Sequence, residues 1–313
     1  MQQFAAAALV AAGAALAALL APYLYAEYAL RQSHDVVSPP PTSSVAGRWA
    51  GDYFVVETID AATFAIGEPR YYQGNYSYLI LGAQRAVLFD AGTGTRDIVP
   101  LVRSLTPLPV TVIPSHLHFD HVGGLGRFDR TALIDDQSLR ARIVDSNLTL
   151  RRYEFLGFGD HLPAPTFQVD EWWAPDTNVD LGDRILGVVA TPGHTPTSVS
   201  LYDRDRHQLF VGDFLYPGLL YAQLPGASRS AYLASAGRLL TIVDPGTRIY
   251  TAHMARLPAA ARAPVLEVAD LKALERSLNA LNAGHADWTG FYPQIYPVRG
   301  KVRFATGFPW NNR

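Results

Sequence analysis

The chain has 313 residues, a formal net charge of −2 and no cysteine. A chain of this length can bury a sizeable core, and its balanced charge lacks the basic footprint of nucleic-acid-binding proteins. Without cysteine there is neither a disulfide framework nor thiolate chemistry. We therefore expect no nucleic-acid partner, and the composition leaves the oligomeric state open.

Residues 1–32 form a hydrophobic segment. There is no charged residue between Phe4 and Leu24, where Ala, Leu and Val dominate. A helix needs about 20 such residues to span a bilayer. The run is longer than the apolar core of a signal peptide, and the basic start of one is missing. We favour an uncleaved membrane anchor over a cleaved signal peptide. Either would place the protein at a membrane or outside the cytoplasm, with the periplasmic or extracellular side favoured.

Three further regions follow the hydrophobic segment. Residues 33–50 are rich in Pro and Ser and predict an extended linker. Residues 51–283 carry the strand and helix patterns of one catalytic domain. Residues 284–313 form an aromatic-rich extension that could cover the core, pair as strands or contact a membrane. Because a linker separates the anchor from the domain, we expect a protein that starts near Ser44 to be soluble and fully active.

Strands and helices are expected in two similar halves. Runs of β-branched, aromatic and leucine residues bounded by Gly or Pro predict strands, and apolar residues at helical spacing predict helices. The first half has strands at 75–82, 85–92 and 109–116 with a helix at 95–105. The second has strands at 184–194, 197–203, 207–213 and 247–253, a helix at 230–243 that begins at Ser230, and a helix at 271–281 that ends near Gly284. This order predicts an α/β fold, an αββα sandwich in which two mixed β-sheets pack face to face with helices outside.

The segment SHLHFDHVGG, residues 115–124, holds three of the nine histidines of the chain. Imidazole and carboxylate groups at this spacing suit a divalent ion such as zinc. His116 and His118 point the same way in an extended chain, whereas Asp120 and His121 can turn toward a second ion. The pattern is denser than a polar surface loop requires, and it predicts a metal site.

The segment HLHFDH resembles the His-x-His-x-Asp-His signature of the metallo-β-lactamase superfamily. Four further segments resemble family motifs in the same order, although the last has Thr-Ala-His where Pro-Gly-His is usual: LFDAG (88–92), TPGHT (191–195), VGDFLY (211–216) and YTAHM (250–254). The resemblance implies two divalent metal ions, zinc first, with iron or manganese as alternatives. It assigns His116, His118 and His194 to one ion, Asp120, His121 and His253 to the other, and Asp213 as the bridge.

The same resemblance implies a hydrolase of small acyl substrates. A metal-bridging hydroxide would attack an ester, thioester or lactone carbonyl, and Asp120 would both ligate and orient this nucleophile. Asp90 would support the histidine loop by hydrogen bonds. Tyr216 follows Asp213 by three residues, a spacing at which lactonases place a tyrosine that bonds the substrate carbonyl. A core aromatic is the other interpretation of Tyr216.

Several substrate classes stay open. Residues 181–216 are similar to the acyl-coenzyme A thioesterase branch, and Asp213 is similar to glyoxalase II and the lactonases. The β-lactamase branches carry Cys or Ser at that position, so hydrolysis of β-lactam amides is a less favoured alternative. An N-acyl-homoserine lactonase and a non-catalytic domain are two further alternatives. Coenzyme A would be an awkward substrate outside the cytoplasm. The aromatic-rich residues 153–173 are either a lid over an apolar acyl groove or a loop packed on the scaffold.

Overall fold

The computed structural model describes residues 2–30, 37–38, 44–254 and 260–307. Half of the predicted linker, residues 33–50, lies outside the described residues. The last residues of this segment are described, and they already belong to a sheet as strand β2. The first sheet has the order β2-β3-β4-β5-β6-β7, and only its last pair, β6 with β7, is parallel. Its strands are β2 (Arg48–Ala50), β3 (Phe54–Asp60), β4 (Thr63–Glu68), β5 (Asn75–Leu81), β6 (Ala86–Phe89) and β7 (Val110–Ile113).

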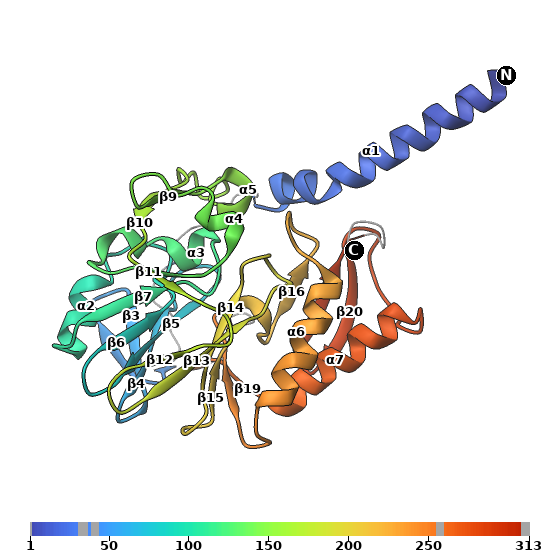
Figure 1. The fold of residues 1–313 in the computed structure, drawn as a ribbon. Helices are drawn as coiled ribbons and strands as arrows, with labels where there is room; N and C mark the ends of the chain where they lie inside the picture. Colours follow the sequence, from blue (N-terminus) through green and yellow to red (C-terminus); the bar gives the residue numbers. More distant parts are fainter. Residues whose placement is uncertain (1, 31–36, 39–43, 255–259, 308–313) are drawn as a thin grey trace.

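The second sheet faces the first across the core (Figure 1). It has the order β12-β13-β14-β15-β17-β19, with one parallel pair, β15 with β17. Its strands are β12 (Asn178–Asp180), β13 (Ile185–Ala190), β14 (Val199–Asp203), β15 (Gln208–Phe210), β17 (Arg248–Tyr250) and β19 (Val265–Glu267). Two mixed sheets with helices outside confirm the predicted αββα sandwich.

Arg184 joins the two sheets from inside. Its guanidinium donates to Asp203 at 2.6 Å in the second sheet and to the carbonyl of Ala62, 2.8 Å away, at the first. Arg184 and Asp203 are both buried. A buried charge is tolerated only when it is paired and hydrogen-bonded, and this pair meets both conditions.

The helices cover the outer faces. They are α2 (Val99–Leu105), α3 (Phe119–Val122), α4 (Gln137–Arg140), α5 (Arg152–Phe155), α6 (Arg229–Ile242) and α7 (Val268–Asn282), with 3-10 turns η1 (Leu125–Arg127) and η2 (Gly212–Phe214). The helices α6 and α7 pack together on the side of the second sheet (Figure 1). The cap of α6 is Ser228 rather than the predicted Ser230, because the Ser228 hydroxyl accepts the N–H of Ala231 at 3.2 Å.

Shorter strands complete the body. A third sheet has the order β16-β21-β20, formed by β16 (Leu219–Ala222), β20 (Gln294–Arg299) and β21 (Val302–Thr306). Residues 294–306 of the C-terminal extension therefore pair as strands, and Tyr296 and Phe304 are buried there. Three two-stranded pairs remain: β8 (Ala132–Ile134) with β11 (Glu171–Trp173), β9 (Asn147–Thr149) with β10 (Thr166–Gln168), and β1 (Ser44–Val45) with β18 (Ala260–Ala261).

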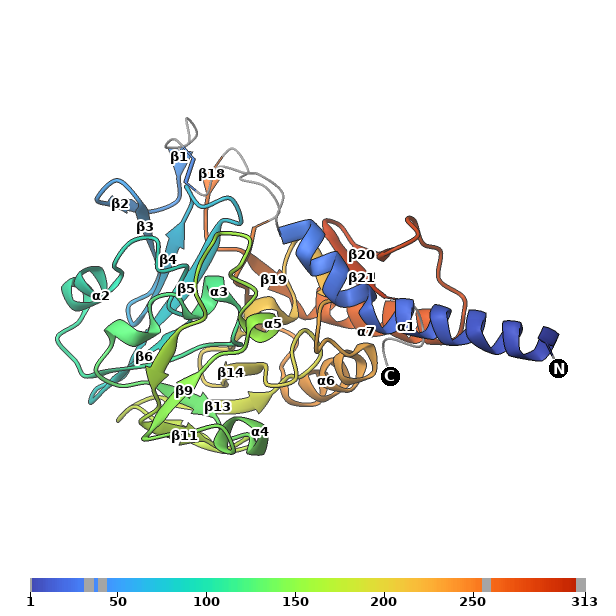
Figure 2. The ribbon, with the colours of Figure 1, turned by 90° about the horizontal axis from the view of Figure 1, so that it is seen from above.

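The N-terminal helix α1 (Gln2–Leu30) leaves the body as a rod (Figures 1 and 2). Its stretch Ala12–Leu30 is long and apolar enough to cross a membrane, by length and composition only. Leu19 is 67% exposed. The C-terminal end of α1, in contrast, packs against the body, where Ala26 is fully buried. This contact was not predicted from the sequence.

Candidate metal centre

The seven predicted ligands meet at one edge of the sandwich. The chain segments that follow β7, β13, β15 and β17 carry these side chains to the same edge. Strand ends on a rigid scaffold commonly present functional side chains in this way. All seven side chains are buried. Their ligand atoms fall into three overlapping groups, each within 4.8 Å: His116, His118 and His194; His116, His121 and Asp213; and Asp120, His121 and His253.

The first cluster consists of three histidines. His118 Nδ1 lies 2.9 Å from His116 Nε2 and 3.1 Å from His194 Nε2. Ligands of a tetrahedral zinc ion with bonds of 2.0–2.1 Å lie about 3.3 Å apart. The three nitrogens are therefore spaced as ligands of one ion would be. The other nitrogen of His194, Nδ1, lies 2.9 Å from the carbonyl of Tyr221, which leaves Nε2 as the lone-pair donor.

The second cluster combines Asp120, His121 and His253. Oδ2 of Asp120 lies 3.3 Å from His253 Nε2 and 3.6 Å from His121 Nε2. His253 stands in the cluster although its Thr-Ala-His segment departs from the family pattern. His253 reaches the cluster because it follows β17; the identity of the two residues before it does not change this position.

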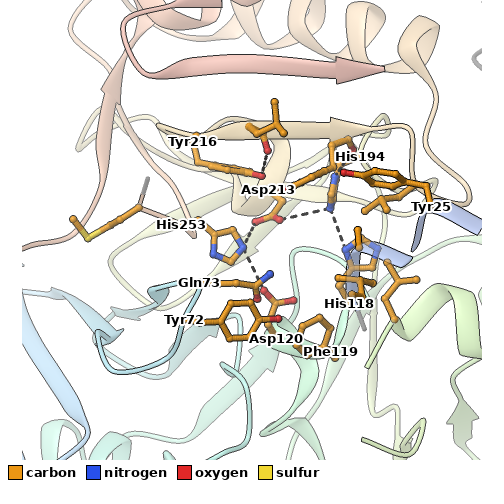
Figure 3. A pocket seen from close by; sticks show the side chains of 18 residues that line it. Tyr25, Tyr72, Gln73, His118, Phe119, Asp120, His194, Asp213, Tyr216 and His253 are labelled. Atoms are coloured by element: carbon orange, nitrogen blue, oxygen red, sulfur yellow. Dashed lines mark hydrogen bonds and ion pairs between the residues drawn. The ribbon is translucent and has the colours of Figure 1, made fainter. Parts of the chain in front are cut away.

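Asp213 lies between the clusters (Figure 3). Its Oδ2 is 3.6 Å from His194 Nε2, whereas its Oδ1 is 3.4 Å from His121 Nε2 and 3.0 Å from His253 Nε2. One carboxylate thus presents one oxygen to each cluster, which is the geometry of a bridging ligand.

The buried polar atoms fit a metal centre. Oδ1 of Asp213 and Nε2 of His121 are buried and contact only other ligand-type side chains, without a hydrogen bond of proper geometry among the described residues. Buried polar atoms that lack a hydrogen bond are costly, and both atoms point into the cluster. A divalent ion would satisfy them, and the mixed imidazole and carboxylate donors suit zinc.

Burial and charge set the protonation of the two clusters. Burial lowers the pKa of His116 and His118 well below the usual range, and the neighbouring histidines add to this effect. Burial also lowers the pKa of His194. The lowered pKa favours the neutral imidazole, which has a lone pair to offer a metal.

The second cluster has a negative potential. Burial opposes a charged imidazole, but Asp90, Asp120 and Asp213 outweigh it and raise the pKa of His121 well above its usual range. Asp213 raises the pKa of His253 in the same way against burial. Burial likewise opposes ionised Asp213, yet His253 and His121 hold its pKa well below the usual range. Such a cluster favours a cation.

Asp90 holds the histidine loop in place. Its carboxylate accepts the N–H of Ser115 at 2.6 Å and the hydroxyl of Ser115 at 3.0 Å, and it lies 2.9 Å from His121 Nδ1. This is the supporting role predicted from the sequence. Gly212 makes the close approach of the Asp213 segment feasible: its φ is +53°, and a Cβ there would lie 2.2 Å from the Ser115 hydroxyl oxygen.

Asn75 is a site residue that the sequence analysis missed. Its Nδ2 donates to the carbonyl oxygen of Asp120 at 2.9 Å and to Oδ2 of Asp120 at 3.1 Å. Asn75 is buried at the start of β5. A polar residue at the start of a strand is only a weak indication of a site residue, and nothing in the sequence places Asn75 beside Asp120.

Five of the seven ligand-type side chains line a pocket of about 340 Å³: His118, Asp120, His194, Asp213 and His253. Figure 3 shows Tyr72, Gln73, Tyr216 and Tyr25 around the predicted metal ligands. Tyr216 is buried, its ring lies 5.2 Å from that of His253, and its hydroxyl donates to the carbonyl of Leu219. Of the aromatic-rich segment 153–173, Leu156 reaches the pocket.

Sequence comparison agrees with this geometry. A sequence model of the Metallo-beta-lactamase superfamily matches residues 71–240, more than half of the chain. The chain therefore belongs to the metallo-β-lactamase superfamily, a family of hydrolases, and its His/Asp cluster is a candidate site for divalent metal.

Individual relatives are more specific. The chain is 30% identical over 215 residues to acyl-coenzyme A thioesterase MBLAC2 of Gallus gallus, a match that covers 62% of this chain and 78% of that protein. It is 27% identical over 192 residues to the hydroxyacylglutathione hydrolase of Synechococcus sp. (strain JA-3-3Ab), covering 57% of this chain and 63% of that protein. Among solved structures, a metallo-beta-lactamase from Pontibacter korlensis matches with a TM-score of 0.54 and 18% identity, covering 72% of this chain and 99% of that one. This last likeness supports the fold alone.

Proposed function

We propose that the protein is a binuclear metal-dependent hydrolase of acyl thioesters. The observation that carries this proposal is the convergence of seven buried ligand-type side chains, five of which line one pocket. His116, His118 and His194 would hold one divalent ion, Asp120, His121 and His253 the other, and Asp213 would bridge them. Zinc suits this donor set best, and iron or manganese could replace it.

The ions would polarise the substrate carbonyl and activate a water molecule as the nucleophile at neutral pH. The protein has to hold both reactants in line. Asp120 would orient the water, and Asn75 fixes Asp120 through its two hydrogen bonds.

A second cavity supports a thioester with an anionic carrier. This cavity, of about 600 Å³, shares His118 with the catalytic pocket and is lined by Arg142, Arg151 and Arg152. Glu154 pairs with Arg142 and Glu27 pairs with Arg152, whereas Arg151 has no ion pair among the described residues. Guanidinium groups bind phosphates well. A carrier of the coenzyme A type would fit there, in agreement with the thioesterase relative.

Tyr216 is the second proposed catalytic residue. Its hydroxyl donates to Leu219 in the structure, so it would have to exchange this partner for the developing oxyanion of the substrate. Its ring already lies beside His253 at the pocket floor.

A lactone is the second candidate substrate. The spacing of Tyr216 after Asp213 favours it, whereas the arginine-lined cavity has no partner in an uncharged lactone. Full-length protein should be tested against dodecanoyl-coenzyme A, an N-acyl-homoserine lactone and the β-lactam nitrocefin. We expect the thioester to have the highest kcat/KM. A higher value for the lactone or for nitrocefin would replace the thioester proposal.

The helix α1 is the proposed membrane anchor. Leu16 and Leu19 of α1 are exposed. The uncharged run from Phe4 to Leu24 has the length of a span, so the turns that dock on the catalytic domain lie at or beyond its end. We propose that it tethers the catalytic domain to a membrane.

A further inference from the structure

The end of α1 is fixed to the catalytic domain by polar contacts. Glu27 lies 2.7 Å from the guanidinium of Arg152 and accepts the hydroxyl of Tyr153 at 3.1 Å. The ring of Tyr23 meets that of Tyr153 edge to face, with centroids 4.8 Å apart. The ion pair and the aromatic contact each stabilise the docked position of α1 only modestly, but both hold the same two turns of this helix.

The backbone contact at Gly159 is closer still. A Cβ at Gly159 would lie 2.0 Å from the carbonyl oxygen of Leu30. The last turn of α1 therefore rests directly on the loop that follows α5, and a side chain at residue 159 would separate them. Together with the burial of Ala26, this shows a packed interface rather than a loose tether.

The docked turns also line the catalytic pocket. Tyr25, Ala29 and Leu30 share the pocket with His118, His194 and Asp213, and Figure 3 shows Tyr25 beside His194. Further apolar residues line the same pocket: Phe119, Leu156, Leu219, Leu224 and Met254. No Lys or Arg is among the described residues that line this pocket. Such a surface suits a hydrocarbon chain and offers no partner to a charged acyl group.

We propose that the last two turns of α1 form the acyl-binding wall of the active site, and that Leu30 determines selectivity for long, apolar acyl chains. This inference rests on the proposed thioesterase function for its substrate class. It assigns a substrate-binding role to a helix that lies outside residues 71–240, the part of the chain that matches the family. It also replaces the expectation that a protein starting near Ser44 is fully active.

The test uses full-length protein and two thioethers that cannot be hydrolysed, S-dodecyl-coenzyme A and S-butyl-coenzyme A. Binding is measured by calorimetry for the wild type, Leu30→Trp, Leu30→Ala and Leu24→Trp. Leu24 lies on the same helix, is 63% exposed and does not line the pocket, so it is the matched control. Leu30→Ala removes atoms and introduces no clash. The thermal midpoint of each variant shows whether it is folded.

We expect Leu30→Trp and Leu30→Ala to weaken binding of the dodecyl compound about tenfold, and binding of the butyl compound less than about twofold. Leu24→Trp should change neither. The inference is overturned if both compounds are affected equally, if Leu24→Trp has the same effect, or if the wild type binds the dodecyl compound no more tightly than the butyl one. Hydrolysis is measured separately on dodecanoyl-coenzyme A. Chain-length-selective binding without hydrolysis would refute the proposed function and leave the acyl wall in place.

Discussion

Asn75 shows how one residue outside the ligand set can control the reaction. It donates twice to Asp120, the residue proposed to orient the nucleophile. We predict that Asn75→Ala lowers kcat about tenfold, or about 1.4 kcal/mol of barrier, because Asp120 loses its fixed orientation. Metal content should stay unchanged, since every ligand remains. Steady-state kinetics and metal analysis check this, with exposed Asn178→Ala as the control. An unchanged kcat would remove Asn75 from the catalytic account.

Tyr216 offers a second test at this scale. If its hydroxyl turns from Leu219 to the substrate oxyanion as proposed, Tyr216→Phe removes one hydrogen bond from the transition state. We predict a loss of about 10–100-fold in kcat, or about 1.4–2.7 kcal/mol. Thermal unfolding is measured in parallel. A normal kcat together with a lower thermal midpoint would show that the hydroxyl only anchors the Leu219 turn.

The ligand-type residues could be placed from the sequence because they lie in short motifs at strand ends. His116, His118, Asp120 and His121 are neighbours along the chain, and the structure brings His253 to them. Asn75 could not be predicted in this way. Its partner lies 45 positions away in the sequence. The pairing of β5, β6 and β7 within the first sheet brings the start of β5 and the segment after β7 to the same edge.

Among the elements, seven of the twelve strands in the two main sheets lie where apolar runs predicted them, because burial between two layers demands such runs: β5, β6, β7, β13, β14, β15 and β17. The other five strands, β2, β3, β4, β12 and β19, were not predicted. Helix ends were less predictable. We expected a helix at 95–105, but α2 begins at Val99, where the Asp97 carboxylate accepts the N–H of Val99 at 3.0 Å and a proline occupies the first turn. The N-cap residue, Ile98, makes no side-chain cap, so the apolar spacing used to predict the helix did not mark its first residue.

The contact between α1 and the loop after α5 can be tested at Gly159. We predict that Gly159→Ala weakens docking of α1, because its Cβ would overlap the Leu30 carbonyl oxygen. Amide hydrogen exchange of residues 23–30 should then accelerate at least about tenfold. Gly246→Ala is the matched control, since a Cβ there meets nothing within 4 Å. Equal exchange in both variants would mean that the loop yields and α1 stays docked.

For the whole molecule, α1 unites anchoring with substrate binding. Its apolar rod predicts that full-length protein sediments with membranes. Replacing Leu16 and Leu19 together by Asp should release it, because each buried Asp costs about 2.5–3.5 kcal/mol near the centre of a span. Val144→Asp, at a 69% exposed position of the body, is the control. Fractionation with intact-mass measurement checks this. Soluble wild-type protein with its N-terminus intact would contradict the anchor, and a mass lacking about the first 26 residues would indicate a cleaved signal peptide.

The central claim is that thioester hydrolysis depends on two metal ions held by the His/Asp cluster. The most direct measurement is hydrolysis of dodecanoyl-coenzyme A by chelator-treated full-length protein as zinc is added back. We predict that activity rises until about two ions are bound per chain, and that Asp213→Ala, which lacks the bridge, binds fewer ions and stays inactive. Full activity at one ion per chain, or hydrolysis that is indifferent to the chelator, would contradict the account.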